Sequence, residues 1–181
     1  RDGTFIDVNP SFSAVFGWDS SEIAGRSAPE LGIWRDEAQR QALYHQLTRH
    51  QGLENAEAHF RTKNGQHVTC VVSSRFIRID RRLCIVTTFR DITKRQQAEA
   101  ALKVSEAKFS TAFHSSPNAL IISERSTGRF IEVNEGFRRL YGYRPEEVIG
   151  RTSADLGIWP VAQRQEILER LERDGRVVSW E

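Results

Sequence analysis

The stretch GTFIDVNPSFSAVFGWDSSEIAGRSAPELGIW, residues 3–34, returns 125 residues later as GRFIEVNEGFRRLYGYRPEEVIGRTSADLGIW, residues 128–159. The two stretches align without a gap, and 14 of the 32 aligned positions are identical. Similarity at one fixed offset indicates two copies of one structural unit. Because the offset is too long for the repeat of a solenoid, we expect two tandem domains in this chain of 181 residues.

Helices follow the first strand of the repeated unit. Residues 5–8 are predicted to form a short apolar strand, and Asn9 follows as the N-cap of a short helix. Residues 36–50 are predicted to form a longer helix that turns Leu43 and Leu47 inward.

Alternating apolar residues then predict three strands, at residues 56–60, 67–79 and 83–90, with an Asn-Gly turn at 64–65 between the first two. The second copy adds residues 118–134, which read as a strand, a turn and a strand. A complete unit is therefore predicted as an α+β fold, a five-stranded antiparallel sheet with short helices packed on one face. We expect the first copy to lack its first strand and the second copy to end before its last two.

Six motifs carry a family resemblance: FIDVNPSFSAVFGW, FIEVNEGFRRLYGY, EIAGR, EVIGR, RTKNGQHV and RDITKRQQAEAAL. Together they resemble the PAS domain with its C-terminal PAC motif, and the Asp-Ile-Thr triplet of the last one is the most specific. The resemblance covers essentially the whole chain. It implies a first PAS domain at residues 1–93, a helical linker at 94–115 and a second, truncated PAS domain at 116–181.

The resemblance implies a sensory segment of a multidomain bacterial signalling protein. Such domains bind small ligands or cofactors, dimerise, and pass conformational changes to an output domain, which is commonly a histidine kinase, a diguanylate cyclase or a cyclic-di-GMP phosphodiesterase. The chain has no Walker loop, and no motif places a nucleophile beside a base, so we expect no catalysis by this segment. The alternative is a structural dimerisation or protein-interaction module that binds no ligand.

The cofactor signatures of related PAS domains are missing. Photoactive flavin-binding domains carry a cysteine where this chain has GRSAPELGIW and GRTSADLGIW. Haem-binding domains carry a histidine on the longer helix at a position that is not histidine in either copy. Four histidines fall in one region but at spacings that do not converge on a metal: His45, His50, His59 and His67. We therefore predict no haem, no thiol-adduct flavin and no metal, and the small ligand stays unidentified.

Four apolar residues are candidates for lining a ligand pocket: Trp34, Leu43, Leu47 and Trp159. A tryptophan that follows Leu-Gly-Ile in both copies also fits a place in the core, where it would wedge the helices onto the sheet. We favour the core interpretation for both tryptophans.

The segment from Asp91 to His114 contains neither glycine nor proline and is rich in helix-forming residues, so we expect one continuous helix that couples the two units. Apolar or small residues recur along it at intervals of four and three, which predicts the seam of a short coiled coil: Ala98, Leu102, Ser105, Phe109 and Ala112. By resemblance, Asp91, Ile92 and Thr93 relay signals from the last strand to this helix. A plain spacer is the alternative.

The amino-acid composition limits the classes of partner that this chain is expected to bind. The 26 basic and 24 acidic residues are mixed along the chain, which excludes the basic stripe of a nucleic-acid-binding surface. No apolar run approaches the ~18 residues of a membrane span, so we expect a cytoplasmic segment without membrane contact, whose parent protein could be anchored elsewhere. The sequence has no methionine, and we expect it to be part of a longer chain that ends in an output domain. Because both copies lack strands, we expect a homodimer in which strand exchange could fill the open sheet edges.

Overall fold

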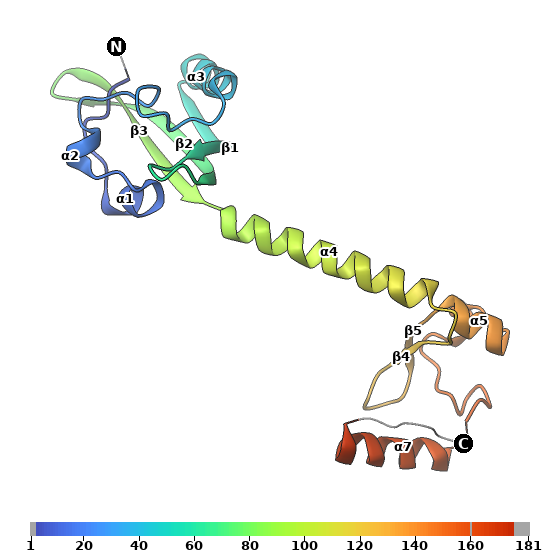
Figure 1. Cartoon of the computed structure of the whole chain (residues 1–181). Coiled ribbons are helices and arrows are strands. Elements are labelled where there is room, and N and C mark those ends of the chain that lie inside the picture. The colour runs from blue at the N-terminus through green and yellow to red at the C-terminus, as the bar shows by residue number, and fades with distance from the viewer. Residues whose placement is uncertain (1–2, 160, 176–181) are drawn as a thin grey trace. The chain divides into compact units, whose positions relative to one another are not determined.

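The computed structural model of the chain describes residues 3–159 and 161–175. Its contacts divide the chain into two compact units, which we call unit one (Arg1–Ala101) and unit two (Leu102–Glu181). Both are mixtures of helices and antiparallel strands (Figure 1).

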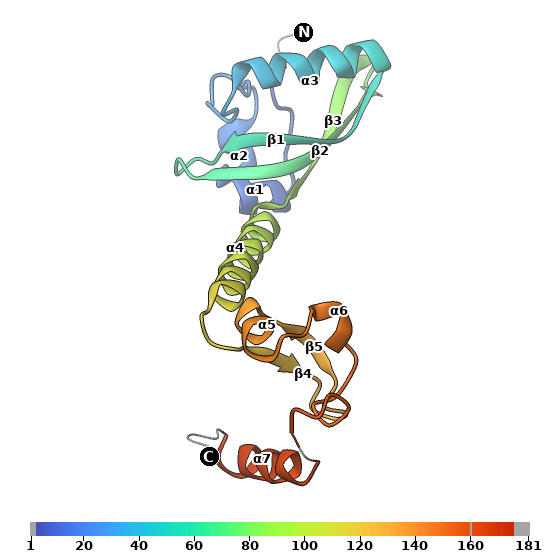
Figure 2. The ribbon, with the colours of Figure 1, turned by 90° about the vertical axis from the view of Figure 1, so that its right-hand side faces the viewer.

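Unit one contains three helices followed by three strands. These elements are α1 (Pro10–Phe16), α2 (Ser20–Ile23), α3 (Glu37–His50), β1 (Gly52–Arg61), β2 (His67–Ile79) and β3 (Arg82–Asp91). The strands form an antiparallel sheet in the order β1-β2-β3. Helix α3 lies alongside β1 (Figure 2).

Local sequence signals explain where these elements begin and end. The Asn9 side chain accepts a hydrogen bond from Phe12 N at 2.9 Å and so caps α1, as predicted. Asp36 caps α3 in the same way, by accepting from Ala38 N at 2.9 Å. At the predicted Asn-Gly turn, Gly65 has a φ of 79°, a left-handed conformation that glycine adopts without strain. The predicted longer helix and the β1–β2 hairpin are confirmed.

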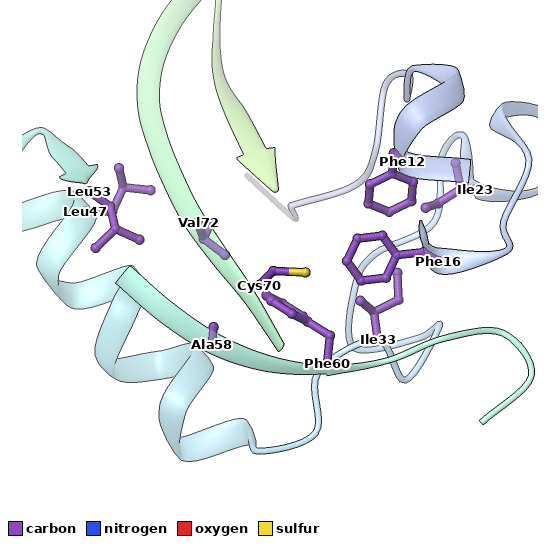
Figure 3. Close-up of a cluster of buried hydrophobic side chains, with 10 residues drawn as sticks. All are labelled: Phe12, Phe16, Ile23, Ile33, Leu47, Leu53, Ala58, Phe60, Cys70 and Val72. Atoms are coloured by element: carbon purple, nitrogen blue, oxygen red, sulfur yellow. The ribbon is translucent and has the colours of Figure 1, made fainter. Parts of the chain in front are cut away.

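The core of unit one lies between the helices and the sheet (Figure 3). Ten buried residues from α1, α2, α3, β1, β2 and the connecting loops form it: Phe12, Phe16, Ile23, Ile33, Leu47, Leu53, Ala58, Phe60, Cys70 and Val72. Phe16, Phe60 and Phe89 contact one another edge to face, with ring centroids 5.2–5.6 Å apart. This packing of helices on one sheet face is the arrangement expected for the unit.

The five-stranded sheet predicted for a complete unit is not found, because the described residues form one sheet of three strands and one of two. In unit one the prediction of a strand at residues 5–8 was wrong. Thr4 and Phe5 make only isolated bridges, to Ser27 and Ala24. A strand needs a neighbour that satisfies its backbone groups along its length, and no described segment of unit one supplies one at residues 5–8.

Unit two begins on helix α4 (Thr93–Ser115), which starts in unit one. It continues with β4 (Ile121–Ser123), β5 (Phe130–Val133), α5 (Glu135–Tyr141), α6 (Pro145–Val148) and α7 (Val161–Asp174). Strands β4 and β5 pair antiparallel. Phe130 and Val133 of β5 form a small core with Phe137 of α5 and Val148 of α6. The continuous helix predicted from Asp91 to His114 is confirmed as α4, which begins two residues later than expected.

Candidate functional site at the strand-to-helix junction

The candidate site lies where β3 ends and α4 begins, at Asp91, Ile92 and Thr93. The first backbone N–H groups of a helix have no partner within the helix, so side chains near the start often accept from them. Here the Asp91 carboxylate accepts from Thr93 N at 2.8 Å. Ile92, 6% exposed, is buried at the junction. The last residue of the strand therefore fixes the first turn of the helix.

The Thr93 hydroxyl ties this first turn to the neighbouring strand β2. Its oxygen accepts from Thr69 N at 2.9 Å, and it donates to Thr69 O at 3.5 Å. Ile92 N also donates to Thr69 O, at 2.9 Å. Thr69 therefore uses both of its backbone groups to hold the start of α4.

A second link joins the first turn of α4 to β1. Gln96 donates from its side-chain nitrogen to the Glu57 carboxylate at 3.0 Å. Gln96 N also donates to Ile92 O at 2.9 Å, at the start of the helix. Sequence reasoning missed this pair. A glutamine one turn after Ile92 does not by itself predict a hydrogen bond to the sheet, since only the folded sheet brings Glu57 within reach.

Cys70 lies next to Thr69 and opposite Asp91 in the β2–β3 register. It is fully buried. Burial first, and then the negative charge of Asp91, raise the pKa of the Cys70 thiol to about 12. A thiol with such a pKa stays protonated at neutral pH, so Cys70 is a packing residue of the junction and a poor nucleophile or metal ligand.

The pocket candidates are dispersed. Trp34 is half-buried and packs on Phe60, with ring centroids 4.6 Å apart. Leu47 is part of the core, and Leu43 packs against it from the same helix. Trp159, in unit two, is 42% exposed. Three of the four candidates are therefore part of the hydrophobic interior of unit one or pack against it, and the fourth lies in the other unit.

The histidines weighed as metal ligands do not come together. His59 Nδ1 lies 3.3 Å from the Thr69 hydroxyl, which places this ring beside the junction. Within residues 3–159 and 161–175, no three His, Cys, Asp or Glu side chains are grouped in a way that could hold a metal ion.

The five residues of the predicted coiled-coil seam all lie exposed on α4. The side chains of Leu102 and Phe109 are 59% and 56% exposed. Arg95 and Glu99 form an ion pair of 3.4 Å on the same helix. In the part of the chain that the structure describes, no helix combines the length and apolar character needed to cross a membrane.

The PAS domain family matches residues 1–94 and 117–181. These stretches make up most of the sequence, and the chain belongs to the PAS domain family. A comparison with curated proteins found no match.

Three solved structures resemble parts of the chain. The PAS domain from the fruit-fly ELK potassium channel is 19% identical, with a TM-score of 0.42, over 51% of this chain and 80% of its own. The PAS domain, in complex with ethanol, of a LuxR-family transcriptional regulator from Burkholderia thailandensis is 21% identical, with a TM-score of 0.41, over 51% and 83%. A sensory box histidine kinase/response regulator from the same species is 21% identical, with a TM-score of 0.41, over 57% and 79%. At these identities the likeness concerns the fold alone.

Proposed function

We propose that this chain is a sensory and relay segment of a bacterial signal transduction protein. It consists of two tandem PAS copies, at residues 1–93 and 116–181, joined by the helix 94–115. The internal repeat supports two copies, and so does the match of the family to two separate stretches. The segment itself performs no catalysis. It works in the cytoplasm and passes its signal to an output domain, either a histidine kinase or an enzyme of cyclic-di-GMP turnover.

The observation that carries this proposal is the double hydrogen bond between Thr93 and Thr69. A ligand that binds against the sheet changes the position of β2, and the Thr69 backbone transmits that change to the first turn of α4. Because an α-helix is hydrogen-bonded along its whole length, a rotation imposed at its start is carried to its far end.

The helix transmits the signal through self-association with a second copy of the chain. Leu102 and Phe109 are seven residues apart and exposed, which is the spacing of one seam position in a coiled coil. The other seam residues, Ala98, Ser105 and Ala112, are small and bury little surface. The seam is therefore weak enough for a rotation at the junction to change it.

Replacing Thr93 by valine should loosen the first turn of α4. Valine keeps the shape of the side chain but leaves Thr69 N without its acceptor, which costs about 1–3 kcal/mol for a partly buried group. Hydrogen exchange measured by mass spectrometry should show faster exchange at residues 94–97 and at Thr69. Thr93→Ser, which keeps the hydroxyl, is the matched control and should exchange like the parent. Equal exchange in the valine variant and the parent would contradict the proposal that the Thr93–Thr69 hydrogen bonds couple β2 to α4.

Replacing Phe109 by aspartate should weaken self-association without unfolding either unit. The change places a charge in the seam, where each copy would face the other's carboxylate. Sedimentation velocity measures the association, and circular dichroism checks the fold. Val104→Asp is the matched control, because Val104 is 54% exposed on the same helix but lies outside the seam. If both variants associate like the parent, α4 is a spacer.

The alternative function, dimerisation without a ligand, is favoured by one observation. The interior of unit one is occupied by aromatic side chains, with Phe12 stacked on Phe16 at 4.4 Å and Phe60 against both Phe16 and Trp34. Native mass spectrometry of the purified chain distinguishes the two functions. A bound organic molecule supports the sensor, and the mass of the polypeptide alone after ligand screening supports the dimerisation module.

A further inference from the structure

The hairpin that joins β2 to β3 is longer than the strand beside it. Strand β1 pairs with β2 only as far as Gly52, which lies opposite Arg75. From there β2 continues to Ile79 with β3 as its one partner among the described residues, and the last pair before the turn is Ile79 with Arg82. The end of this hairpin, residues 75–83, is therefore a two-stranded ribbon, which we call the hairpin tip.

Basic residues gather at the hairpin tip. It carries four arginines, Arg75, Arg78, Arg81 and Arg82, and one acidic residue, Asp80. All five residues are exposed. None of the four guanidinium groups forms an ion pair or a hydrogen bond with another of the described residues. The hairpin tip therefore presents an excess of positive charge that the described part of the chain does not neutralise.

The turn holds one of these arginines in a strained backbone conformation. Asp80 and Arg81 are the two turn residues, and their φ angles are 47° and 63°. Positive φ at both positions is typical of the type I′ turn, which favours glycine at the second position because a side chain is disfavoured there. Arg81 thus adds a charge to the tip where glycine would fit without strain, and strained residues of this kind cluster at functional sites.

Apolar side chains accompany the arginines on both faces of the hairpin tip. Residues opposite each other in a hairpin share a face, and successive residues alternate between the faces. Arg78 shares its face with the buried Val72, and its partner Leu83 lies on that face too. Ile79 and Arg82 share the opposite face, so the exposure of Ile79 does not depend on what pairs with the outer edge of β3. Ile79 is 47% exposed and Leu83 is 68% exposed.

We propose that the hairpin tip docks on the surface of an anionic lipid bilayer. The arginines are attracted to the negative surface potential and bind lipid phosphates, with which a guanidinium group forms two hydrogen bonds. Ile79 and Leu83 insert at the boundary between headgroups and acyl chains, while the long arginine side chains keep their charges at the headgroups. Such a peripheral contact requires no membrane-spanning segment. It replaces the expectation, based on the lack of such a segment in the sequence, that this chain makes no membrane contact.

An acidic protein surface is the competing partner, and the placement of the apolar residues disfavours it. A folded protein that binds one face of the hairpin tip leaves the apolar residue of the other face in water. A lipid interface is fluid and surrounds an inserted tip, so it covers Ile79 and Leu83 together. Because the removal of apolar surface from water is favourable, the bilayer gains from both residues and the protein partner from one.

Co-sedimentation of the full chain with lipid vesicles tests the proposal. The vesicles consist either of phosphatidylcholine alone or of phosphatidylcholine with phosphatidylserine. We expect binding only to the vesicles with phosphatidylserine, and weaker binding as the salt concentration rises, because salt screens the charges. Arg81→Ala combined with Arg82→Ala should weaken this binding about 30-fold, since each basic residue near an anionic surface contributes about fivefold.

Three further variants separate the contributions of charge, apolar insertion and stability. Ile79→Ser with Leu83→Ser leaves the charge unchanged and should still weaken binding. Arg81→Gly should weaken binding about fivefold and yet slow hydrogen exchange at the ends of β2 and β3, because glycine relieves the strain of the turn. A purely structural role of the tip would instead link weaker binding to lower stability. Lys103→Ala with Lys108→Ala, which removes the same charge from exposed positions on α4, should bind like the parent.

Four results would overturn the proposal. Binding that is absent, or equal on both kinds of vesicle, excludes the anionic bilayer as the partner. Weaker binding of the lysine variant together with unchanged binding of the arginine variant assigns the contact to α4. Serine variants that bind like the parent contradict the insertion of the tip. Binding to soluble polyglutamate without binding to vesicles makes an acidic protein the partner. The relay through Thr93 is tested separately, by hydrogen exchange at residues 94–97, and none of these outcomes affects it.

Discussion

Replacing Phe60 by alanine should lower the free energy of unfolding of unit one by about 3–5 kcal/mol, the range for truncating a fully buried phenylalanine. Phe60 is 1% exposed. Its ring contacts those of Phe16, Phe89 and Trp34, with centroids 5.6, 5.4 and 4.6 Å away. The cavity left by the ring would therefore be lined by three aromatic side chains, which cannot collapse into it without leaving their own contacts.

Hydrogen exchange at the β1 and β2 amides measures this loss for unit one by itself, because strongly protected amides report the free energy of opening the unit that contains them. Tyr44→Ala is the control. It removes an aromatic ring that is 51% exposed on α3, and such surface changes usually stay within about 0.5 kcal/mol. Equal losses in the two variants would show that Phe60 is not a central core residue.

Elements whose signals are local were predictable from the sequence. Asn9 caps α1, the Asn-Gly pair turns the β1–β2 hairpin, and the absence of glycine and proline produces one unbroken α4. Each of these depends on neighbours within a few residues, where capping, turn chemistry and propensity act.

Strand pairing was less predictable, because it depends on residues far apart in the sequence. Residues 5–8 and 130–133 are nearly identical, yet only the latter form a strand, since β4 is present beside them. Trp34 and Trp159 likewise occupy identical local sequences. Trp34 packs on Phe60, whereas Trp159 is 42% exposed, so the local sequence does not decide its burial.

The residues of the candidate site likewise divide into those that local sequence identifies and those that only the folded sheet brings together. Asp91 and Thr93 were identified from their motif, by resemblance. Their partner Thr69 was not, because the β2–β3 register decides which residue of β2 reaches the start of the helix. The Gln96–Glu57 hydrogen bond was still harder to predict from the sequence, since it depends on the position of β1 as well.

Replacing Asn134 by alanine should destabilise unit two by on the order of 3–5 kcal/mol, because the loss combines a helix cap with several buried hydrogen bonds. The buried Asn134 side chain accepts from Leu120 N and Phe137 N, at 2.8 and 2.9 Å. It donates to Phe113 O and Asn118 O, also at 2.8 and 2.9 Å. Alanine fills none of these roles, and each group left buried without a partner bears its own desolvation cost.

The repeat provides a matched control for this prediction in the same molecule. Asn9→Ala removes the same helix cap from an exposed site and should cost about 0.5–2 kcal/mol. Substitution by aspartate distinguishes the roles of the two asparagines further. Aspartate caps helices as well as asparagine does, but it donates no hydrogen bond when ionised. Asn9→Asp should therefore be nearly neutral, whereas Asn134→Asp should remain strongly destabilising at pH 7, because it turns a carboxylate toward two carbonyl oxygens. Hydrogen exchange of the α1 amides measures the loss of stability at position 9, and exchange of the α5 amides measures it at position 134. Equal losses at the two positions would contradict the difference between Asn9, a helix cap alone, and Asn134, a helix cap that also makes further buried hydrogen bonds.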